Sequence, residues 1–472
     1  RMVFAHYMVG LTYGQTLSDW THEIRTAQAA SIDGFALNIG PNDPYTLTQL
    51  RFAFEAAEGL FTLGHADEEE EDDGGGGAHQ RLPPPFVLFL SFDMAAREWS
   101  VEQVVELIRE FTRSRVYYHH VDERAMVSTF EGPGWADHWE SVRRQVGGAD
   151  GDGDGGQGIF FVPDWSSLGP HGVAGKLAHI DGAFSWAAWP RAGEERITGD
   201  EDREYLREKE KEDKVYMAGV SPWFYTRLPQ WNKNWYSSSE RLWYDRWMQI
   251  LELQPDYVQI ITWNDYGESS YICDPPTRPS QVVPGAEVYV SGHPHAALRA
   301  TLPFLVRAYK SAGLKDCSRA EQLVTTVDDS DNDNQDNSWA VAWYKPQLAR
   351  CGPDGGTVWG QAGTRSAALG ARDVVSVMAV SSVPTTITLY IGNGNGNGDG
   401  DGDKITRPPH PHEHHHHHHH QHQLSFHEIP LHGRTGAVTM AMRGKGSVTG
   451  PAVRGQCVEG EVVGFNCVVI GV

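Results

Sequence analysis

The sequence predicts an α/β protein, a (β/α)8 TIM barrel followed by a smaller antiparallel β-sandwich. In residues 1–315, eight apolar strand-like segments alternate with amphipathic helical segments, which is typical of parallel βαβ units that close into a barrel. In residues 316–472, short strand-like segments lie between Gly- and Pro-rich turns, as in a sandwich. The length of 472 residues and the 40% hydrophobic content are sufficient for such a multi-domain chain.

The barrel strands are short runs of β-branched, aromatic and small apolar residues, expected at 3–10, 34–39, 86–92, 125–130, 159–162, 182–189, 215–220 and 257–263. Helices are expected at 19–31, 46–58, 100–113, 135–146, 200–213, 239–252 and 295–312. Ser18 or Asp19 is the expected N-cap of the first helix. Trp243 and Trp247 lie one turn apart on one helix, so we expect them to pack in the core.

The sandwich strands are expected at 338–344, 374–381, 385–391, 424–431 and 436–442. Low-complexity segments interrupt both domains near 67–77, 147–158 and 392–423. These acidic, Gly-rich and His-rich segments cannot bury apolar surface, so we expect solvated loops. The His run at 414–420 has incidental affinity for transition metals, and we expect neither a metal site nor a cofactor.

The composition excludes several classes of function. A formal net charge of −23 disfavours a nucleic-acid partner or an anionic membrane, since both require a basic surface. No apolar run reaches the ~18 residues of a transmembrane helix. Residues 3–10 already read as a strand, so we expect no signal peptide in this sequence.

Five cysteines are present and none forms a CxxC pair, which disfavours a cysteine zinc site. Two pairings, Cys457 with Cys467 and Cys317 with Cys351, are hypotheses from sequence proximity. Either disulfide would fit a secreted protein, because disulfides persist in oxidising compartments.

The chain is organised around residues 256–271, DYVQIITWNDYGESSY. This stretch begins as a buried strand and ends in two carboxylates, Asp265 and Glu268, three residues apart. The carboxyl end of a barrel strand is where chemistry takes place, and glycosidic bonds are cleaved by pairs of carboxylates. The alternative is that Asp265 caps the following segment and Glu268 is a solvated charge, and the pattern alone does not decide.

Other polar residues lie on or after the expected strands. Asp93 and Asp164 follow the third and fifth strands, where they would bind sugar hydroxyls or tune the pair; alternatively, each caps a loop or supports it by a hydrogen bond. His6 and Asn38, on the first two strands, would hold a substrate hydroxyl or be satisfied core groups.

Aromatic residues gather near the strand ends and loops between residues 186 and 266. Flat rings stack on the CH faces of sugars, so a groove lined in this way suits a glycan, although some of these rings must belong to the core. With their polar neighbours, the candidate substrate-binding residues are Trp186, Trp223, Tyr225, Trp231, Asn232, Trp235, Trp263, Asn264 and Tyr266. Trp189 belongs to the same aromatic series.

Several segments resemble fungal α-1,3-glucanases, the mutanases of glycoside hydrolase family 71. They are VFAHYMVG, IDGFALNIG, FVLFLSFDM, PWFYTRLPQWNKNW and LWYDRWMQILELQPDYVQIITWNDYGES. The resemblance covers most of residues 3–310, and the WNDYGES and WFYTRLPQWNKNW stretches are long and specific. The C-terminal region matches less clearly, and the low-complexity inserts depart from the family.

The resemblance implies a secreted, extracellular or wall-associated enzyme that acts within α-1,3-glucan and inverts the anomeric centre. It also implies that Asp265 and Glu268 are the catalytic carboxylates, because they match the family's DYGE motif. The residues leave open which is the acid; we favour Glu268 as acid and Asp265 as base. We expect a monomer that binds the glucan.

Two alternatives remain open on the sequence. One is a non-catalytic glucan-binding wall protein on the same barrel, which would bind glucan without releasing reducing ends. The other is a barrel hydrolase acting on a different α-glucan. The presence of both carboxylates in one motif counts against the first alternative.

Overall fold

A computed structural model describes residues 1–69, 85–96, 98–147, 158–191, 194–237, 240–311, 338–351, 357–358, 366–381, 385–392, 403–406, 423–456 and 464–472. Its contacts divide the chain into two compact units. The barrel unit comprises residues 1–187, 199–219 and 255–264; the sandwich unit comprises residues 188–198, 220–254 and 265–472. The predicted domain boundary at residue 315, and most of each predicted insert, lie outside the described residues.

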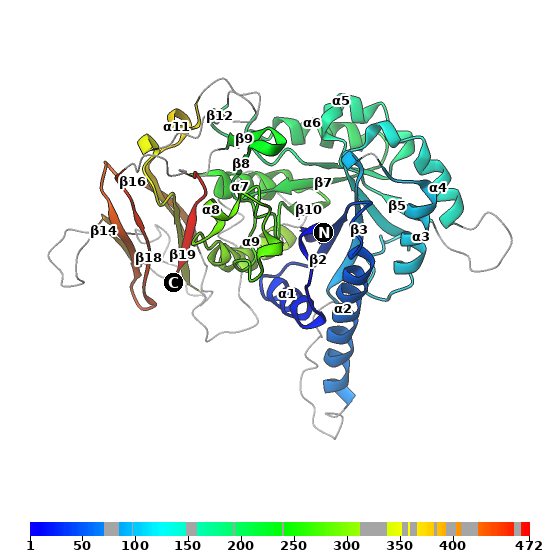
Figure 1. Cartoon of the computed structure of the whole chain (residues 1–472), viewed down its shortest axis with the longest axis horizontal. Coiled ribbons are helices and arrows are strands. Elements are labelled where there is room, and N and C mark those ends of the chain that lie inside the picture. Colours follow the sequence, from blue (N-terminus) through cyan, green and yellow to red (C-terminus); the bar gives the residue numbers. More distant parts are fainter. Residues whose placement is uncertain are drawn as a thin grey trace, which may run out of the picture. The chain divides into compact units, whose positions relative to one another are not determined.

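The barrel unit is built on one eight-stranded sheet whose registered neighbours pair in parallel (Figure 1). In pairing order its strands are β5 (Ile159–Phe161), β4 (Ala125–Phe130), β3 (Val87–Asp93), β2 (Gly34–Ile39), β1 (Met2–Met8), β10 (Tyr257–Ile260), β7 (Val215–Val220) and β6 (Gly182–Ser185). Bridges from Asp164 to Phe130 and Phe184 join the two edges of the sheet, which closes the barrel. The predicted TIM barrel is confirmed.

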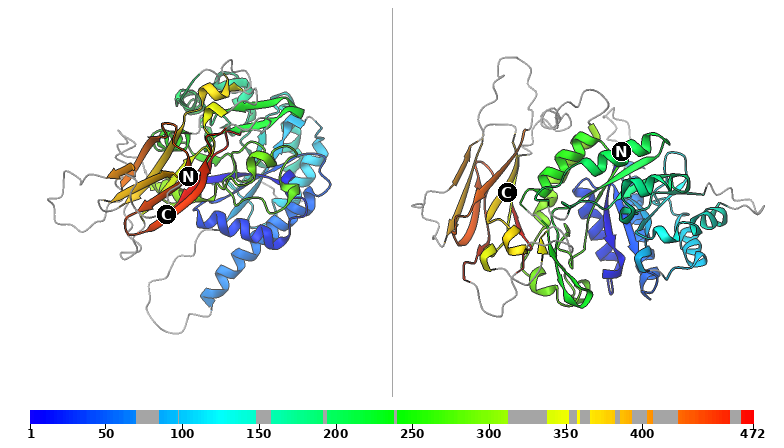
Figure 2. Two further views of the ribbon diagram at one scale, coloured as in Figure 1. Left: turned by 60° about the vertical axis from the view of Figure 1, so that its left-hand side comes forward. Right: turned by 90° about the horizontal axis from the view of Figure 1, so that it is seen from above.

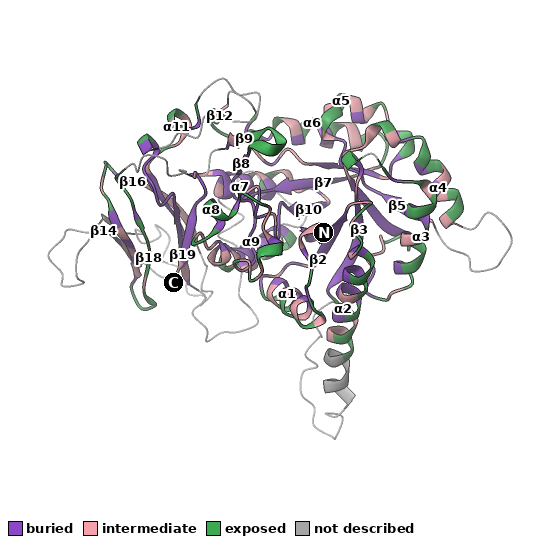
Figure 3. Ribbon diagram, viewed as in Figure 1, coloured by how far each residue is buried: buried purple, intermediate pink, exposed green. Residues whose placement is uncertain are grey.

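Helices alternate with these strands along the chain. Those of the barrel unit are α1 (Leu17–Ala29), α2 (Thr46–Glu69), α3 (Val101–Phe111), α4 (His138–Val146), α5 (Gly169–Ala174) and α6 (Asp200–Glu210). The strands are buried almost throughout because helices cover a parallel barrel from outside, whereas α3 and α4 expose their outer faces (Figure 3). The polar faces of these helices therefore meet the solvent, and the apolar faces meet the sheet.

The first helix begins earlier than the sequence suggested. Its N-cap is Thr16, whose hydroxyl accepts a hydrogen bond from the Asp19 backbone N–H while the Asp19 carboxylate accepts from Thr16 N–H. This reciprocal capping box satisfies two donors at once, so the expected cap at Ser18 or Asp19 was wrong. Helix α2 likewise runs past its expected end at residue 58 to Glu69, since no proline interrupts that stretch.

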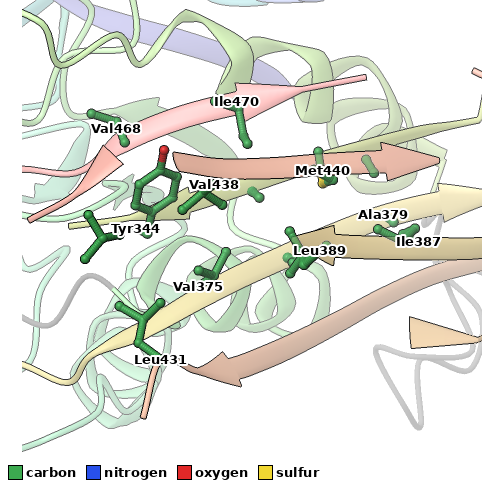
Figure 4. Close-up of a cluster of buried hydrophobic side chains, with 14 of the residues drawn as sticks. Tyr344, Val375, Ala379, Ile387, Leu389, Leu431, Val438, Met440, Val468 and Ile470 are labelled. Carbon is green, nitrogen blue, oxygen red and sulfur yellow. The ribbon is translucent and has the colours of Figure 1, made fainter. Parts of the chain in front are cut away.

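The sandwich unit contains two four-stranded antiparallel sheets, which confirms the predicted sandwich. One sheet has the order β16 (Gln423–Pro430), β13 (Val374–Ser381), β11 (Trp339–Tyr344), β19 (Val468–Gly471); the other has β15 (Asp403–Thr406), β14 (Thr386–Gly392), β17 (Gly436–Met442), β18 (Gly446–Val453). Their strands, yellow to red, lie together in both views of Figure 2. Buried side chains from both sheets, among them Val375, Leu389, Val438 and Met440, form one core (Figure 4).

The sandwich unit also includes segments that follow β7 and β10 in the chain. A hairpin of β8 (Tyr225–Leu228) and β9 (Lys233–Tyr236) gains a third strand, β12 (Thr357–Val358), from the C-terminal region. The described helices of this unit are α7 (Leu242–Leu253), α8 (Glu287–Val290), α9 (Leu302–Ser311) and α11 (Ala367–Gly370). Trp243 and Trp247 of α7 are fully buried and pack edge to face, as predicted.

At most one of the two predicted disulfide pairings can be present. Cys467 carries a thiol, so the suggested pairing with Cys457 was wrong. Cys351 is in a disulfide, and its partner lies outside the described residues. The hypothesis that this partner is Cys317 stays a prediction.

A buried ion pair joins the segment before α7 to the sandwich sheets. Lys345 Nζ lies 2.7 Å from Glu240 Oε1, and both side chains are almost completely buried. Glu240 Oε1 also accepts hydrogen bonds from Tyr236 OH and Arg372 N–H. Burial alone raises the pKa of Glu240, but the Lys345 charge and the hydrogen bonds from Lys345 and the Arg372 N–H lower it to about 2.

We predict that Lys345→Met lowers the free energy of unfolding at neutral pH by about 3–5 kcal/mol, because it leaves the Glu240 charge buried and uncompensated. Glu240 is ionised above its ordinary pKa of ~4.3, so the stability from the pair is present above that pH. It is lost as pH falls through ~4.3 toward the folded value of about 2. Urea denaturation at several pH values measures both effects.

The matched control is Lys211→Met, which removes an exposed lysine paired with Glu208. We expect it to change stability by no more than ~0.5 kcal/mol, since surface pairs contribute little. Equal losses in the two variants would contradict the assignment of Lys345 as a buried structural cation.

Candidate active site

The two predicted carboxylates lie on one tight turn in the sandwich unit, directly after the barrel unit ends at Asn264. Asp265 Oδ1 accepts a hydrogen bond of 2.9 Å from the Glu268 backbone N–H. Asp265 therefore does cap its turn, as the alternative reading of the sequence held. Capping and chemistry are compatible here, because a carboxylate offers several acceptor positions.

Hydrogen bonds from distant segments hold the peptide groups of this turn. The Tyr289 hydroxyl donates to the Gly267 carbonyl at 2.8 Å, and the Tyr225 backbone N–H donates to the Glu268 carbonyl at 3.1 Å. A Cβ at Gly267 would stand 2.8 Å from Val283 Cγ2 and 3.4 Å from Asp265 Oδ1. The position needs glycine because the space is filled, and the spacing of the two carboxyls depends on it.

A cation from the β8–β9 hairpin completes this group. Lys233 Nζ forms an ion pair of 2.7 Å with Glu268 Oε1, and both side chains remain partly exposed. The hairpin tip is held in turn by Gln230, whose amide donates to the Pro284 carbonyl at 2.8 Å. Lys233 was not among the predicted site residues; its place in the WNKNW segment was the only signal in the sequence.

The two carboxyls have different electrostatic surroundings. Burial and, after it, the neighbouring charge of Glu268 raise the pKa of Asp265 to about 7, although Lys233 and the N–H groups of Glu268 and Gly267 act in the opposite direction. Glu268 meets the Lys233 ammonium directly. The protonated form of Asp265 is thus favoured, whereas Glu268 forms an ion pair with Lys233.

The barrel unit places the other predicted carboxyls at the ends of β3 and β5. Asp93 Oδ1 accepts from the Ala95 backbone N–H, and Asp164 Oδ1 accepts from the backbone N–H and hydroxyl of Ser166. Both cap loops. Asp164 is fully buried, and its Oδ2 has no hydrogen-bond partner among the described residues. Burial, with the charge of Glu131, raises the pKa of Asp164 to about 7.

His6 and Asn38 are buried inside the barrel unit. His6 Nδ1 lies 3.0 Å from the Gln259 amide nitrogen, and burial lowers the pKa of His6 to about 3, so the ring is neutral. Its ring packs edge to face on Trp186, which is half-buried. The Asn38 Nδ2 group is buried without a partner in the described part of the chain.

The aromatic candidates divide by exposure. Trp223, Tyr225, Trp263 and Tyr266 are buried, and Trp263 donates its ring N–H to Glu23 of α1. The Asn264 amide binds both the N–H and the carbonyl of Met8. Trp235 is half-buried and stacks on Phe224, and Trp189 is also half-buried. Trp231, 54% exposed, and the adjacent Asn232 are the accessible members.

A sugar can stack only on a ring face that it can reach. Trp231, which precedes Asn232 and Lys233, meets this condition in the sandwich unit, and Trp186 meets it in part in the barrel unit. The substrate-binding roles of all thirteen predicted residues stay predictions. Within the described residues no group of three His, Cys, Asp or Glu side chains has the arrangement of a metal site.

None of the described helices combines the length and apolar character needed to cross a membrane.

The model of the family described as "Glycosyl hydrolase family 71" matches residues 1–471. The chain belongs to glycosyl hydrolase family 71. The resemblance inferred from the WNDYGES and WNKNW segments is thereby confirmed, and so is the predicted class of protein, a glycoside hydrolase, at the level of the family.

Curated relatives of this family 71 chain are named as an endo-1,3-alpha-glucosidase, a mutanase and an endo-1,3-alpha-glucanase. Glucan endo-1,3-alpha-glucosidase agn1 of Schizosaccharomyces pombe is 35% identical over 320 residues, which span 66% of each chain. A mutanase of Penicillium rubens is 31% identical over 407 residues, 83% of this chain and 75% of its own. The ascus wall endo-1,3-alpha-glucanase of Schizosaccharomyces pombe is 32% identical over 317 residues, 66% of each. The match thus spans about two thirds of the length of two relatives.

Among solved structures, the GH99 endo-alpha-mannosidase from Bacteroides thetaiotaomicron aligns with a TM-score of 0.45 at 11% identity. The alignment covers 66% of this chain and 98% of that one.

We predict that Gly267→Ala lowers kcat by about tenfold or more, because the added methyl group presses on Val283 and on the Asp265 carboxyl. The matched control is Gly59→Ala in α2, where a Cβ meets nothing within 4 Å. That change should leave activity unaltered and stability equal or slightly higher, since alanine favours a helix. Equal activity in the two variants would show that the turn tolerates displacement.

Proposed function

We propose that this protein hydrolyses α-1,3-glucosidic bonds in glucan by a single displacement, with Asp265 as general acid and Glu268 as general base. Family membership supports the hydrolytic chemistry, and the names of relatives at 31–35% identity support the linkage. The assignment of acid and base reverses the one that the sequence favoured, which placed the acid at Glu268.

The observation that carries this proposal is the contrast between the two carboxyls. Asp265 is half-buried and its pKa is raised to about 7, while Glu268, also half-buried, is ion-paired with Lys233 at 2.7 Å. Paired titratable groups whose surroundings push their pKa values apart are how one site supplies both an acid and a base. The carboxyl that holds its proton near neutral pH is the one suited to donate it.

In the proposed reaction, Asp265 donates its proton to the glycosidic oxygen as the bond from that oxygen to the anomeric carbon breaks. Glu268 accepts a proton from a water molecule whose oxygen forms the new bond to the same carbon from the opposite face. The product sugar has the inverted anomeric configuration. Exchange of both protons with solvent restores the starting protonation of the two carboxyls.

Exposed groups beside Lys233 are suited to bind the polymer. The Trp231 ring offers a face for stacking, and the Asn232 amide next to it offers hydrogen bonds to sugar hydroxyls. A surface of this kind fits internal segments of a long chain, which supports endo action. The disulfide at Cys351 supports action outside the cell, because such bonds persist in oxidising surroundings.

We predict that Asp265→Asn and Glu268→Gln each reduce hydrolysis of α-1,3-glucan by ~10²–10⁴-fold, the usual contribution of a general acid or base. Reducing-end release measures the loss. The wild-type products, followed by NMR, should appear first as the β anomer. Near wild-type activity in both variants would refute the pair, and first release of the α anomer would refute the single displacement.

The two roles can be separated with an α-1,3-gluco-oligosaccharyl fluoride, whose leaving group needs no proton. Asp265→Asn should hydrolyse this fluoride far better than it hydrolyses glucan, whereas Glu268→Gln should remain impaired on both. The opposite pattern would restore Glu268 as the acid. Parallel assays on α-1,4-glucan test the linkage, and glucan binding without any release of reducing ends would indicate a non-catalytic protein.

The pH dependence should follow the same assignment. We expect kcat/KM to fall as pH rises through the pKa of Asp265, about 7, because the acid then loses its proton. Since the Lys233 charge lowers that pKa, Lys233→Met should move the alkaline limb to higher pH while reducing the maximum rate. Lys211→Met, which removes an exposed lysine from another ion pair, is the control and should leave the profile in place.

A further inference from the structure

We propose that Tyr289, held by Asn466 of the C-terminal segment, is a positioning residue for the two carboxyls, so that the segment leading into the last sandwich strand forms part of the catalytic machinery. The inference deepens the proposed function and rests on it. Neither residue touches the reacting atoms in this proposal. Both act by holding the backbone between Asp265 and Glu268.

The first step is the contact between Tyr289 and the turn. Tyr289, in α8, is almost fully buried, and its hydroxyl donates a hydrogen bond of 2.8 Å to the Gly267 carbonyl. Gly267 lies in the chain between the two carboxylates, so rotation of its peptide group would move both. A rigid aromatic side chain with one hydroxyl at its end is suited to prevent that rotation.

The second step is the support of Tyr289 by Asn466. Asn466 is fully buried, and its amide nitrogen donates to the Tyr289 carbonyl at 2.8 Å and approaches Tyr271 OH at 3.3 Å. Its amide oxygen accepts from the Trp223 ring N–H at 3.1 Å. One side chain therefore binds three segments of the sandwich unit: the one after β7, the one after β10, and α8.

The neighbours of Asn466 reinforce the same contact. A Cβ at Gly464 would stand 2.8 Å from Tyr289 Cβ and 3.4 Å from a ring carbon of Tyr225. On the other side, the Cys467 carbonyl lies 2.9 Å from His295 Nε2, and the His295 ring stacks on Tyr271 at 3.8 Å between ring centroids. The segment 464–467 thus packs directly against the support of the turn, immediately before β19.

These contacts distinguish a support from a separate accessory module. A module joined by a linker would contribute binding, and damage to it would raise KM on polymer. A support fixes the geometry of the acid and the base, so damage to it should lower kcat and leave KM almost unchanged.

The experiment measures kcat and KM on a soluble α-1,3-gluco-oligosaccharide for the full chain, with thermal unfolding of each variant as the measure of folding. Tyr289→Phe deletes only the hydroxyl that binds Gly267. Gly464→Ala pushes on Tyr289 without removing a hydrogen bond. Tyr344→Phe is the matched control, because Tyr344 is equally buried and donates its hydroxyl to the Pro451 carbonyl inside the sandwich.

We expect Tyr289→Phe and Gly464→Ala each to lower kcat by about tenfold with KM within about twofold, at a temperature where both are fully folded. Tyr344→Phe should match the wild type in kcat and KM. Wild-type kcat in Tyr289→Phe, or a loss that equals the unfolded fraction, would overturn the inference.

Glu268→Gln, measured beside these variants, separates the two proposals. If it is inactive while Tyr289→Phe is fully active, only the positioning role fails. If Glu268→Gln keeps wild-type activity, the proposed function fails and the inference falls with it.

Discussion

The turn from Asp265 to Glu268 depends on hydrogen bonds that come from segments distant in the sequence. Tyr225 and Tyr289 bind the carbonyls of Glu268 and Gly267, and the space beside Gly267 is filled by Val283. A turn has many accessible shapes when isolated, and fixing each residue costs about 1–2 kcal/mol of conformational free energy. The surrounding contacts order the turn during folding, so no further conformational free energy is needed to order it during a reaction. Two carboxyls three residues apart can then serve as one site.

The electrostatics of this site follow from where each group lies on the turn. Asp265 accepts a hydrogen bond from an N–H group of its own turn, whereas Glu268 is paired with Lys233 of the β8–β9 hairpin. Lys233 therefore has two effects, since it pairs with Glu268 and also lowers the pKa of Asp265, which the Glu268 charge raises. Separate surroundings for two similar acids are what general acid–base chemistry on a sugar requires. Residue type alone, Asp or Glu, does not determine which role each takes.

The sequence predicted the barrel well because the same pattern repeats along the chain. Each of the eight buried strands is an apolar run, and each helix between them has apolar residues at the helical period of ~3.6 residues. It also singled out Asp265 and Glu268 as candidates, since a polar turn after an apolar strand is a local pattern. It missed Lys233, Tyr289 and Asn466 because their roles arise from contacts across 22 to 177 positions. The burial of several candidate rings could not be predicted for the same reason. Trp223 and Trp263 lie near strand ends, but only the tertiary structure shows that Asn466 and Glu23 take their ring N–H groups.

The sandwich unit contains one contact that stabilises the fold and another that supports the turn of the proposed active site. The Glu240–Lys345 pair is a buried charge contact between the segment before α7 and the sandwich, and Asn466 is a neutral hydrogen-bonded support of Tyr289, which binds the turn from Asp265 to Glu268. The Glu240–Lys345 pair depends on ionisation and the hydrogen bonds of Asn466 do not, so acid weakens the ion pair and leaves these hydrogen bonds in place. Both, however, require the sandwich to be folded, because β19 and β11 carry or adjoin the residues concerned. Local unfolding of these strands would therefore remove the support that Asn466 gives to Tyr289 and, through it, to the turn.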